Sequence, residues 1–393
     1  MLSGVPHALV VLLGTRRTAV PAMDQLRLVD HHCHGVIDHQ PDGEEFRILA
    51  TEADRLSDPG LETLDSPYGL ALKKHVFPLF GLGLEATYDE FLTARARHDP
   101  RDLNRTMIAG TNTSHLVVDT GLHGSTLMTP AQLEDHTGIP SFEVVRLERM
   151  AEEAAPGSTP GTFASRFRDA IREASAEAAG FKSIIAYRYG LDVGDEPPAA
   201  ADVRSAFAEW QRSSEHEQRY RLTSPVLMQH ILWEAVQLQK PIQFHVGYGD
   251  SDVSLYRADP SRLTRFLAAT VASGTRFALL HCYPFVREAA ILSQIFPHVY
   301  ADVGVVTHFL GPASATPLRH LLEIAPFNKV LYSSDAYGLP EHYLVSAANW
   351  RAALGSLLDE WIGGGWVSAG EAERIAVLMA SGNAERIYDL ERP

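Results

Sequence analysis

The chain has only two cysteines, only five lysines and no long apolar run. Two cysteines, Cys33 and Cys282, exclude a framework of structural disulfides and indicate a reducing compartment. No apolar stretch approaches the roughly 18 residues that a membrane span needs. The net charge of −15 and the absence of a basic stripe argue against nucleic acid as a partner. We therefore expect a cytoplasmic protein that acts on a small molecule, with homo-oligomerisation left open.

The N-terminal segment does not have the pattern of a secretory signal. Its short apolar stretch, residues 7–14, precedes Arg16 and Arg17, whereas a signal has the basic residues first. Met23 lies directly before the first predicted strand and offers an alternative start. We expect residues 1–22 to be a disordered extension and residues 23–393 to form the functional domain.

Short apolar runs alternate with amphipathic segments over most of the chain. With 393 residues, 45% apolar and 21% charged, the composition suits a single large α/β domain. Alternating strands and helices predict parallel βαβ units, and eight strands fit a (β/α)8 barrel. The predicted strands cover Leu26–His32, Ser114–Asp119, Glu143–Leu147, Phe181–Tyr187, Pro241–Val246, Arg276–His281, His298–Val303 and Lys329–Ser334. The clearest predicted helices cover Phe163–Ala178, Pro225–Gln239, Pro260–Ala272, Val286–Ile295, Pro317–Ile324, Glu341–Leu358 and Ala369–Leu378.

The first and second predicted strands are separated by far more chain than one crossover helix needs. Residues 42–108 contain three helical patterns, and we interpret this segment as a helical insertion over the mouth of the barrel. There it would shape a substrate pocket. A lid with only a packing role is the alternative.

The motif Asp-His-His-Cys-His at residues 30–34 ends the first predicted strand. Side chains alternate along a strand, so His32 and His34 lie on one face and can bind one divalent metal together. Two histidines alone are a weak signal, because strand histidines are often satisfied by backbone carbonyls.

Four more residues occupy equivalent positions in later strands, and all carry chemistry that a metal centre uses. Lys182 lies in the fourth strand, His245 and His281 end the fifth and sixth, and Asp335 follows the eighth. The carboxyl ends of barrel strands ring one mouth, so these residues can share a site. Imidazoles and a carboxylate suit zinc, and a carboxylate can also take a proton from water activated by the metal. Each residue alone could be an ordinary strand-end polar group; together they indicate a metal site.

This order of motifs resembles the amidohydrolase superfamily, in particular its "amidohydrolase 2" branch. The resemblance runs from Leu26 to Leu390 and includes Phe-Ala-Leu-Leu-His-Cys-Tyr-Pro, Val-Tyr-Ala-Asp-Val-Gly, Tyr-Ser-Ser-Asp-Ala and Gly-Asn-Ala-Glu-Arg-Ile-Tyr-Asp-Leu. It is looser over residues 42–170. That branch includes the amidohydrolase-like half of fungal fusions to glutamine synthetase, and also metal-dependent decarboxylases.

The resemblance leaves one or two metals open, and Lys182 decides between them. In binuclear members a carboxylated lysine of the fourth strand bridges two ions. Here that implies one metal on His32, His34 and Asp335, a second on His245 and His281, and a bridging hydroxide whose proton Asp335 accepts. Zinc is the first choice, with iron or manganese as alternatives. If Lys182 only reaches solvent or pairs with an acid, the resemblance implies one metal, with His281 as the catalytic acid and base.

Four residues are weaker candidates for binding substrate. Arg188 follows the fourth strand and could bind a carboxylate or phosphate, or form a salt bridge. Tyr248 and Tyr283 follow histidines of the metal type and could bind a carbonyl, or simply pack. His308 follows the seventh strand and is either a neighbour of a metal ligand or a surface residue. We interpret both cysteines as small buried side chains, not nucleophiles.

Three functions follow from these residues. The first is a hydrolase in which metal-activated hydroxide cleaves an amide, lactam, ester or thioester such as an acyl-CoA; superfamily members with two iron ions cleave acyl thioesters in secondary metabolism. The second is a mononuclear, non-oxidative decarboxylase of an aromatic or unsaturated acid. The third is a non-catalytic metal sensor or scaffold, which would need the insertion to close off the mouth.

Overall fold

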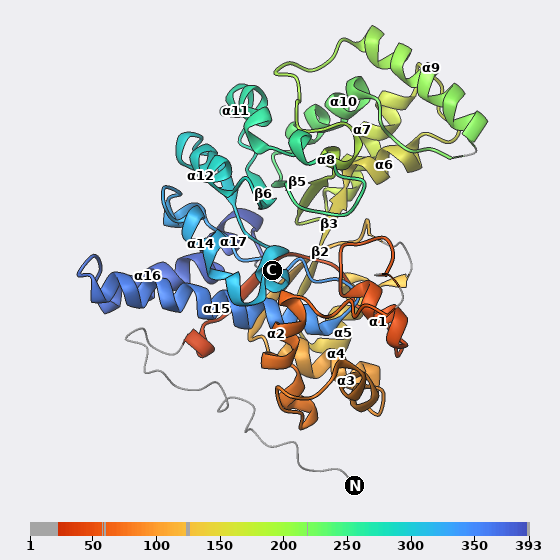
Figure 1. The fold of residues 1–393 in the computed structure, drawn as a ribbon. Helices are drawn as coiled ribbons and strands as arrows, with labels where there is room; N and C mark the ends of the chain where they lie inside the picture. The colour runs from red at the N-terminus through yellow and green to blue at the C-terminus, as the bar shows by residue number, and fades with distance from the viewer. Residues whose placement is uncertain (1–22, 57, 59, 123–125, 218, 391–393) are drawn as a thin grey trace.

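Seven parallel strands form one curved sheet in which each strand pairs with the next along the chain (Figure 1). The computed structural model describes residues 23–56, 58, 60–122, 126–217 and 219–390, so the predicted extension 1–22 lies outside the described residues. The strands are β1 (Leu28–Cys33), β2 (Thr113–Asp119), β3 (Ser141–Arg146), β4 (Gly180–Ser183), β5 (Ile242–Val246), β6 (Phe277–His281) and β7 (Val299–Ala301). Their short, buried runs of apolar residues are typical of a parallel sheet covered by helices.

The segment after β7 lies between the two edges of the sheet. Leu331 donates its N–H to Ala301 of β7, and His31 of β1 donates to the carbonyl of Tyr332. The structure therefore confirms the predicted α/β barrel class, with seven strands and this extended segment in place of the eighth strand expected at Lys329–Ser334. The ladder is interrupted because the N–H of Ser334 donates to the Asp30 carboxylate.

The fourth strand is shorter than its apolar pattern predicts. It ends at Ser183, and a short helix follows at Ile185–Arg188. The Ser183 hydroxyl and the Ile184 N–H both donate to the carboxylate of Glu148 instead of to a neighbouring strand. The buried carboxylate of Glu148 therefore ends the strand at Ser183, and the short helix begins there.

Helices surround the sheet and connect its strands (Figure 1). They are α1 (Gly43–Leu49), α2 (Pro67–His75), α3 (Tyr88–Arg95), α4 (Pro100–Ala109), α5 (Pro130–Thr137), α6 (Leu147–Ala154), α7 (Phe163–Ala174), α8 (Ile185–Arg188), α9 (Ala200–Glu217), α10 (Pro225–Val236), α11 (Thr264–Thr270), α12 (Val286–Ile295), α13 (Val306–Phe309), α14 (Ala315–Leu321), α15 (Pro340–Gly363), α16 (Ala369–Val377) and α17 (Asn383–Tyr388). In the described part of the chain, no helix combines the length and apolar character that crossing a membrane requires.

Helices α1–α4 and the turns between them have an apolar core of their own. It includes Phe46, Phe77 and Phe91 and extends onto Leu339 and Val345, at the start of α15. A buried ion pair reinforces this contact: Arg95 Nε of α3 lies 2.6 Å from Glu341 Oε1 of α15. The segment is thus fixed to the helix that follows the last part of the barrel.

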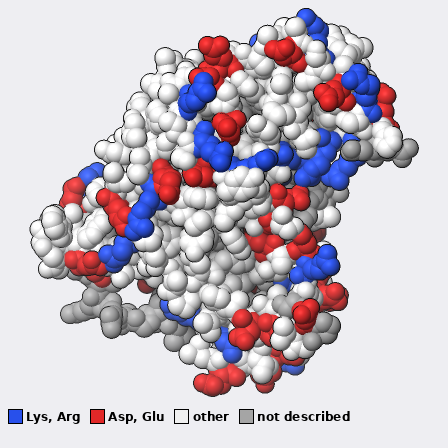
Figure 2. Space-filling model, turned by 45° about the horizontal axis from the view of Figure 1, so that its top comes forward, with Lys and Arg blue, Asp and Glu red and all other residues white. Residues whose placement is uncertain are grey.

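The excess of acidic residues does not produce a uniformly acidic surface. Figure 2 shows a band of Lys and Arg side chains across the middle of one face, with Asp and Glu side chains gathered beside it. Ion pairs connect neighbouring helices, for example Arg168 of α7 with Glu234 of α10.

Candidate metal centre

The carboxylate of Asp335 faces imidazoles from two different strands. Its Oδ1 lies 3.0 Å from His32 Nε2 and 3.4 Å from His34 Nε2, and its Oδ2 lies 3.5 Å from His281 Nε2. Only 13% of the Asp335 side chain is exposed. Burial opposes its ionisation, but the imidazoles of His281, His32 and His34 outweigh burial and hold the pKa of Asp335 well below its usual value. A carboxylate and three ring nitrogens therefore converge at the carboxyl ends of the strands.

The hydrogen bonds behind His32 and His34 fix which ring nitrogen is free. His32 Nδ1 lies 2.8 Å from the side-chain oxygen of Gln243, and His34 Nδ1 lies 2.8 Å from the carbonyl of Asp119. Because these oxygens only accept hydrogen bonds, each Nδ1 carries the proton and each Nε2 presents a lone pair. This is the tautomer that binds a metal. Burial and the charge of Lys182 lower the pKa of His32 to about 3, which keeps it neutral as a ligand must be.

The amine of Lys182, on β4, lies in the same centre. Its Nζ lies 3.2 Å from His32 Nε2, and the residue is 2% exposed. Burial lowers the pKa of Lys182 to about 8, although the charges of Asp119 and Asp335 oppose this shift. The amine is therefore poised between its charged and neutral forms near neutral pH.

His245 and His281 lie side by side, with ring centroids 4.7 Å apart. His245 is buried, and its Nε2 has no hydrogen-bond partner among the described residues. Burial, followed by the charges of His281 and Lys182, lowers the pKa of His245 well below its usual value. His281 differs from His32 and His34, because its Nδ1 accepts the N–H of Val305 at 3.4 Å. When His281 is neutral, its proton is thus on Nε2 and points at Asp335.

Two clusters within the described ranges could hold a metal ion through three side chains of the His, Cys, Asp and Glu types. One is His32, His34 and Asp119; the other is His32, His281 and Asp335, and within each the ligand atoms lie within 4.8 Å of one another. The chemistry of this donor set fits zinc or a similar divalent ion.

The prediction did not include three residues that support the centre. Asp119 ends β2 and pairs with Arg146 of β3 at 2.6 Å. Gln243 holds His32, and Asp302 after β7 accepts hydrogen bonds from His31 Nε2 at 2.7 Å and from the N–H of His281 at 2.6 Å. Two had a visible signal, because Asp119 ends a predicted strand and Gln243 is two residues before His245, on the same face of β5.

The backbone is strained where the site is built. His281 has φ 68° and Asp335 has φ 50°, a left-handed conformation that side chains other than glycine rarely adopt. Two glycines leave room for the histidines beside them. A Cβ at Gly304 would lie 3.0 Å from His281 Nδ1, and one at Gly249 would lie 3.0 Å from His245 Nε2. The backbone beside these two rings therefore has little room for another conformation or a larger residue.

The four predicted substrate residues lie in different surroundings. Arg188 is largely buried, and its Nη1 is 3.3 Å from Glu152 Oε1, while its Nε has no partner among the described residues. Tyr283 is exposed, and Tyr248 is partly buried against Phe309, with ring centroids 6.2 Å apart.

His308 is fully buried, so the surface alternative is wrong. It packs on His342 with ring centroids 4.6 Å apart, and neither of its ring nitrogens has a partner among the described residues. Cys33 and Cys282 are free and buried, and burial raises the pKa of both thiols well above the usual value. They fit the interpretation as packing residues.

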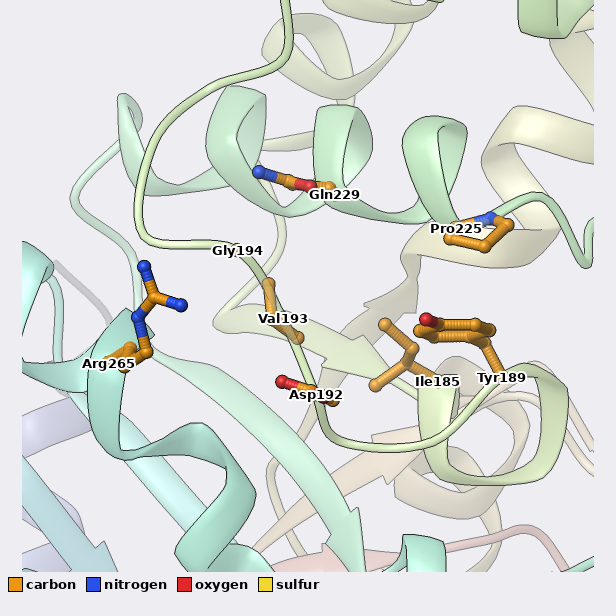
Figure 3. A pocket seen from close by; sticks show the side chains of 8 residues that line it. All are labelled: Ile185, Tyr189, Asp192, Val193, Gly194, Pro225, Gln229 and Arg265. Atoms are coloured by element: carbon orange, nitrogen blue, oxygen red, sulfur yellow. The ribbon is translucent and has the colours of Figure 1, made fainter.

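A cavity of about 240 Å³ lies away from the histidines, between α8, the loop after it, α10 and α11 (Figure 3). Two of its polar side chains already have partners: Arg265 pairs with Asp195 at 2.7 Å, and Gln229 donates to the carbonyl of Glu196. It contains none of the residues that carry the chemistry of the metal centre.

Comparison with known proteins agrees with the geometry of the centre. The family model described as "Amidohydrolase" matches residues 140–390. Protein fluG of Emericella nidulans is 31% identical over 228 residues, which are 54% of this chain but only 26% of that protein. The chain thus spans about a quarter of this curated relative.

Solved structures give the same fold. A protein from Lactobacillus casei, named only provisionally as a metal-dependent hydrolase, is 26% identical with a TM-score of 0.80, over 96% of this chain and 99% of that one. A uronate isomerase from Thermotoga maritima is 11% identical with a TM-score of 0.61, over 95% and 98%, and shows the fold alone. The predicted superfamily is confirmed: because the family model covers well over half of its residues, this chain belongs to the amidohydrolases.

Proposed function

We propose that this chain is a metal-dependent hydrolase that cleaves an amide, ester or thioester of a carboxylic acid, with His32, His34 and Asp335 as metal ligands. One observation carries the proposal: a buried carboxylate faces the free Nε2 atoms of two histidines whose tautomer is fixed for metal binding. Family membership and the Lactobacillus casei relative support it.

The metal, when bound, supplies a Lewis acid that polarises the scissile carbonyl and lowers the pKa of a water molecule. Asp335 is ionised at neutral pH, so it can accept a proton from the attacking water. Asp335 can then return that proton to the leaving group, while the Nε2–H of His281, 3.5 Å from Asp335 Oδ2, orients the carboxylate. The side chains of His281 and Asp335 are only 1% and 13% exposed, so bulk water competes little for these hydrogen bonds.

The position of Lys182 favours two metal ions. Its neutral amine can attack carbon dioxide; a new N–C bond forms, a proton is lost, and a carbamate results. A pKa of about 8 makes this neutral form accessible, and because Nζ lies 3.2 Å from His32 Nε2, a carbamate formed on it would lie close to the proposed ligands. His245 and His281 would then hold the second ion. Zinc is preferred, with iron or manganese as alternatives.

The tautomer of His281 favours a second candidate. A histidine that binds a metal through Nε2 normally carries its proton on Nδ1, yet here Nδ1 accepts the N–H of Val305. With one metal on His32, His34, His245 and Asp335, His281 remains free as an acid and base. That arrangement suits non-oxidative decarboxylation of an aromatic or unsaturated acid.

Substrate binding is proposed at the edge of the mouth. Arg188 has unmatched donors for a carboxylate, and Tyr248 and Tyr283 present hydroxyls on the loops after β5 and β6. His308 is proposed as a neutral, buried group near the centre, because burial keeps its pKa well below the usual value and Asp335 lies within its electrostatic reach. The helical segment 42–108 would act as an insertion that closes one wall of this pocket.

A substrate panel tests the proposal. Chromogenic amides, esters and thioesters are compared with aromatic acids, using protein loaded with zinc, manganese or iron. We expect turnover of at least one hydrolysable class, lost on chelation, and reduced at least 100-fold in Asp335→Asn. Turnover of the aromatic acids alone would favour the decarboxylase, and inertness toward both panels with metal bound would overturn both proposals.

A further inference from the structure

A buried hydrogen-bond network of five side chains connects Asp302, after β7, to the proposed metal ligand His32 by way of the C-terminal helix α17. His31 Nε2 lies 2.7 Å from Asp302 Oδ2, and His31 Nδ1 lies 3.1 Å from the hydroxyl of Tyr388 in α17. Gln243 Nε2 donates to the Tyr388 oxygen at 2.9 Å, and Gln243 Oε1 lies 2.8 Å from His32 Nδ1. Each of the five residues is at most 4% exposed, so their polar atoms have to satisfy one another.

The carboxylate of Asp302 sets the direction of the hydrogen bond at its end of the network. Its Oδ1 accepts the backbone N–H groups of His281 and Gly304 at 2.6 Å and 2.9 Å, and its Oδ2 accepts the hydroxyl of Ser333 at 2.8 Å. A carboxylate that faces three other donors acts as an acceptor only. The proton between Asp302 and His31 is therefore on His31 Nε2.

The orientation of the Gln243 amide follows from the backbone carbonyl of His31. This carbonyl can only accept a hydrogen bond, and it lies 2.7 Å from one end of the amide, so that end is the NH₂ group. The second hydrogen of the NH₂ group points at the Tyr388 oxygen. The other end of the amide, Oε1, therefore faces His32 and accepts the hydrogen of Nδ1.

The hydroxyl hydrogen of Tyr388 has one acceptor. Gln243 Nε2 uses both of its hydrogens as a donor, so His31 Nδ1 is the remaining partner of the phenol among the described residues. The hydrogen bonds of the network therefore all run in one direction, from His32 through Gln243, Tyr388 and His31 to Asp302. At the start of this series, the Nε2 of His32 is left with a free lone pair.

We propose that Tyr388 is a positioning residue of the metal centre, which fixes the Gln243 amide and thereby keeps the Nε2 lone pair of His32 free for a metal. This inference rests on the proposed function, because it takes His32 as a metal ligand. It also gives a role to two parts of the sequence that the metal ligands do not explain. These are the first histidine of the Asp-His-His-Cys-His motif and the Ile-Tyr-Asp-Leu run at residues 387–390.

The variant Tyr388→Phe tests the inference, because it removes only the hydroxyl and leaves one N–H of Gln243 without an acceptor. The amide is then held by the His31 carbonyl alone, and its turned form donates to His32 Nδ1 and favours the other tautomer. ¹⁵N NMR of full-length, zinc-free protein with labelled histidines reads this tautomer, and the His32 signals are identified by their loss in His32→Ala. We expect the proton on Nδ1 in wild type and a mixture of tautomers in Tyr388→Phe.

Zinc affinity measured by chelator competition gives a second readout. It should fall about fivefold in Tyr388→Phe, as is typical when one buried hydrogen bond behind a metal ligand is lost. In a Gln243→Leu background the same substitution should cause no further loss, because Tyr388 acts through that amide.

The matched control is Tyr300→Phe, which removes a buried phenol hydroxyl that also contacts α17 but lies outside the network. Tyr300 is 4% exposed, and its oxygen accepts a hydrogen bond from Arg386 Nη1 at 3.1 Å. This variant should keep the His32 tautomer and the zinc affinity of wild type. An equal loss of affinity in the control would mean that the docking of α17, and not the network, matters, and would overturn the inference.

Three other results would also overturn it: a pure Nδ1–H tautomer of His32 in Tyr388→Phe, unchanged zinc affinity in that variant, or a full further loss in the Gln243→Leu background. The tautomer is read without metal and without substrate. A wild-type protein that shows the expected tautomer but binds no zinc would therefore contradict the proposed function, while the NMR comparison would still support the role of Tyr388 in fixing His32.

Discussion

The buried ion pair between Arg95 and Glu341 connects the helices of residues 43–109 to the barrel, and its removal should be costly. Arg95 Nε lies 2.6 Å from Glu341 Oε1 and Nη2 lies 3.4 Å from Oε2, and the side chains are 2% and 0% exposed. At an effective dielectric constant of about 20, two charges about 4 Å apart attract by about 4 kcal/mol. Arg95→Met removes that attraction and leaves the Glu341 charge buried without a partner. We expect the free energy of unfolding to fall by about 3–5 kcal/mol.

Urea denaturation followed by circular dichroism measures this loss. Arg168→Met is the matched control, because Arg168 forms a similarly short, two-pronged pair with Glu234 but is 44% exposed. Solvent screens that pair, so its loss should be several-fold smaller. The double variant Arg95→Met/Glu341→Leu should recover most of the stability, since apolar side chains can replace a buried pair. A loss in Arg95→Met no larger than in the control would refute the reasoning.

Three further predictions concern the metal centre. Gln243→Leu removes the acceptor that fixes the tautomer of His32, so metal affinity measured by chelator competition should fall about 10–100-fold; unchanged affinity would contradict this role. Because the pKa of Lys182 is about 8, its amine becomes neutral as pH rises through this value. The carbamate signal in ¹³C NMR with labelled bicarbonate should therefore grow from pH 6 to pH 9, most steeply around pH 8; its absence at pH 9 would argue against carboxylation. Gly304→Ala should lower turnover at least tenfold, since its Cβ would overlap Ser333 Oγ and lie 3.0 Å from His281 Nδ1. Gly370→Ala in α16, with open space around it, should keep turnover and stabilise the helix slightly.

The sequence identifies the barrel and its histidines because both depend on local periodicity. His32 and His34 share a face through the alternation of one strand, and Val286–Ile295 is a helix over the predicted residues. Lys182 and Asp335 could be placed at the same mouth because all parallel strands end on one side. The fold and the candidate ligands thus follow from the periodicity of single strands and helices, together with the rule that parallel barrel strands end on one side.

The parts that sequence could not give depend on contacts between distant segments. Strand β4 ends early because Glu148, from another element, takes its hydrogen bonds. The place of residues 49–54 after α1 depends on His342, Tyr337 and Ser251, none of which is marked by a motif. The tautomer of His281 depends on one backbone N–H of the loop after β7. No periodicity records such contacts.

Metal content measured by elemental analysis tests the central claim most directly. Wild type, the double variant His32→Ala/His34→Ala, Lys182→Ala and the exposed control Lys74→Ala are purified in bicarbonate buffer and loaded with zinc. We expect about two ions per chain in wild type and Lys74→Ala, about one or none in Lys182→Ala, and none in the histidine variant. About one ion in both wild type and Lys182→Ala would remove the bridge and favour the single-metal site. No bound metal in wild type, or full content in the histidine variant, would contradict the account.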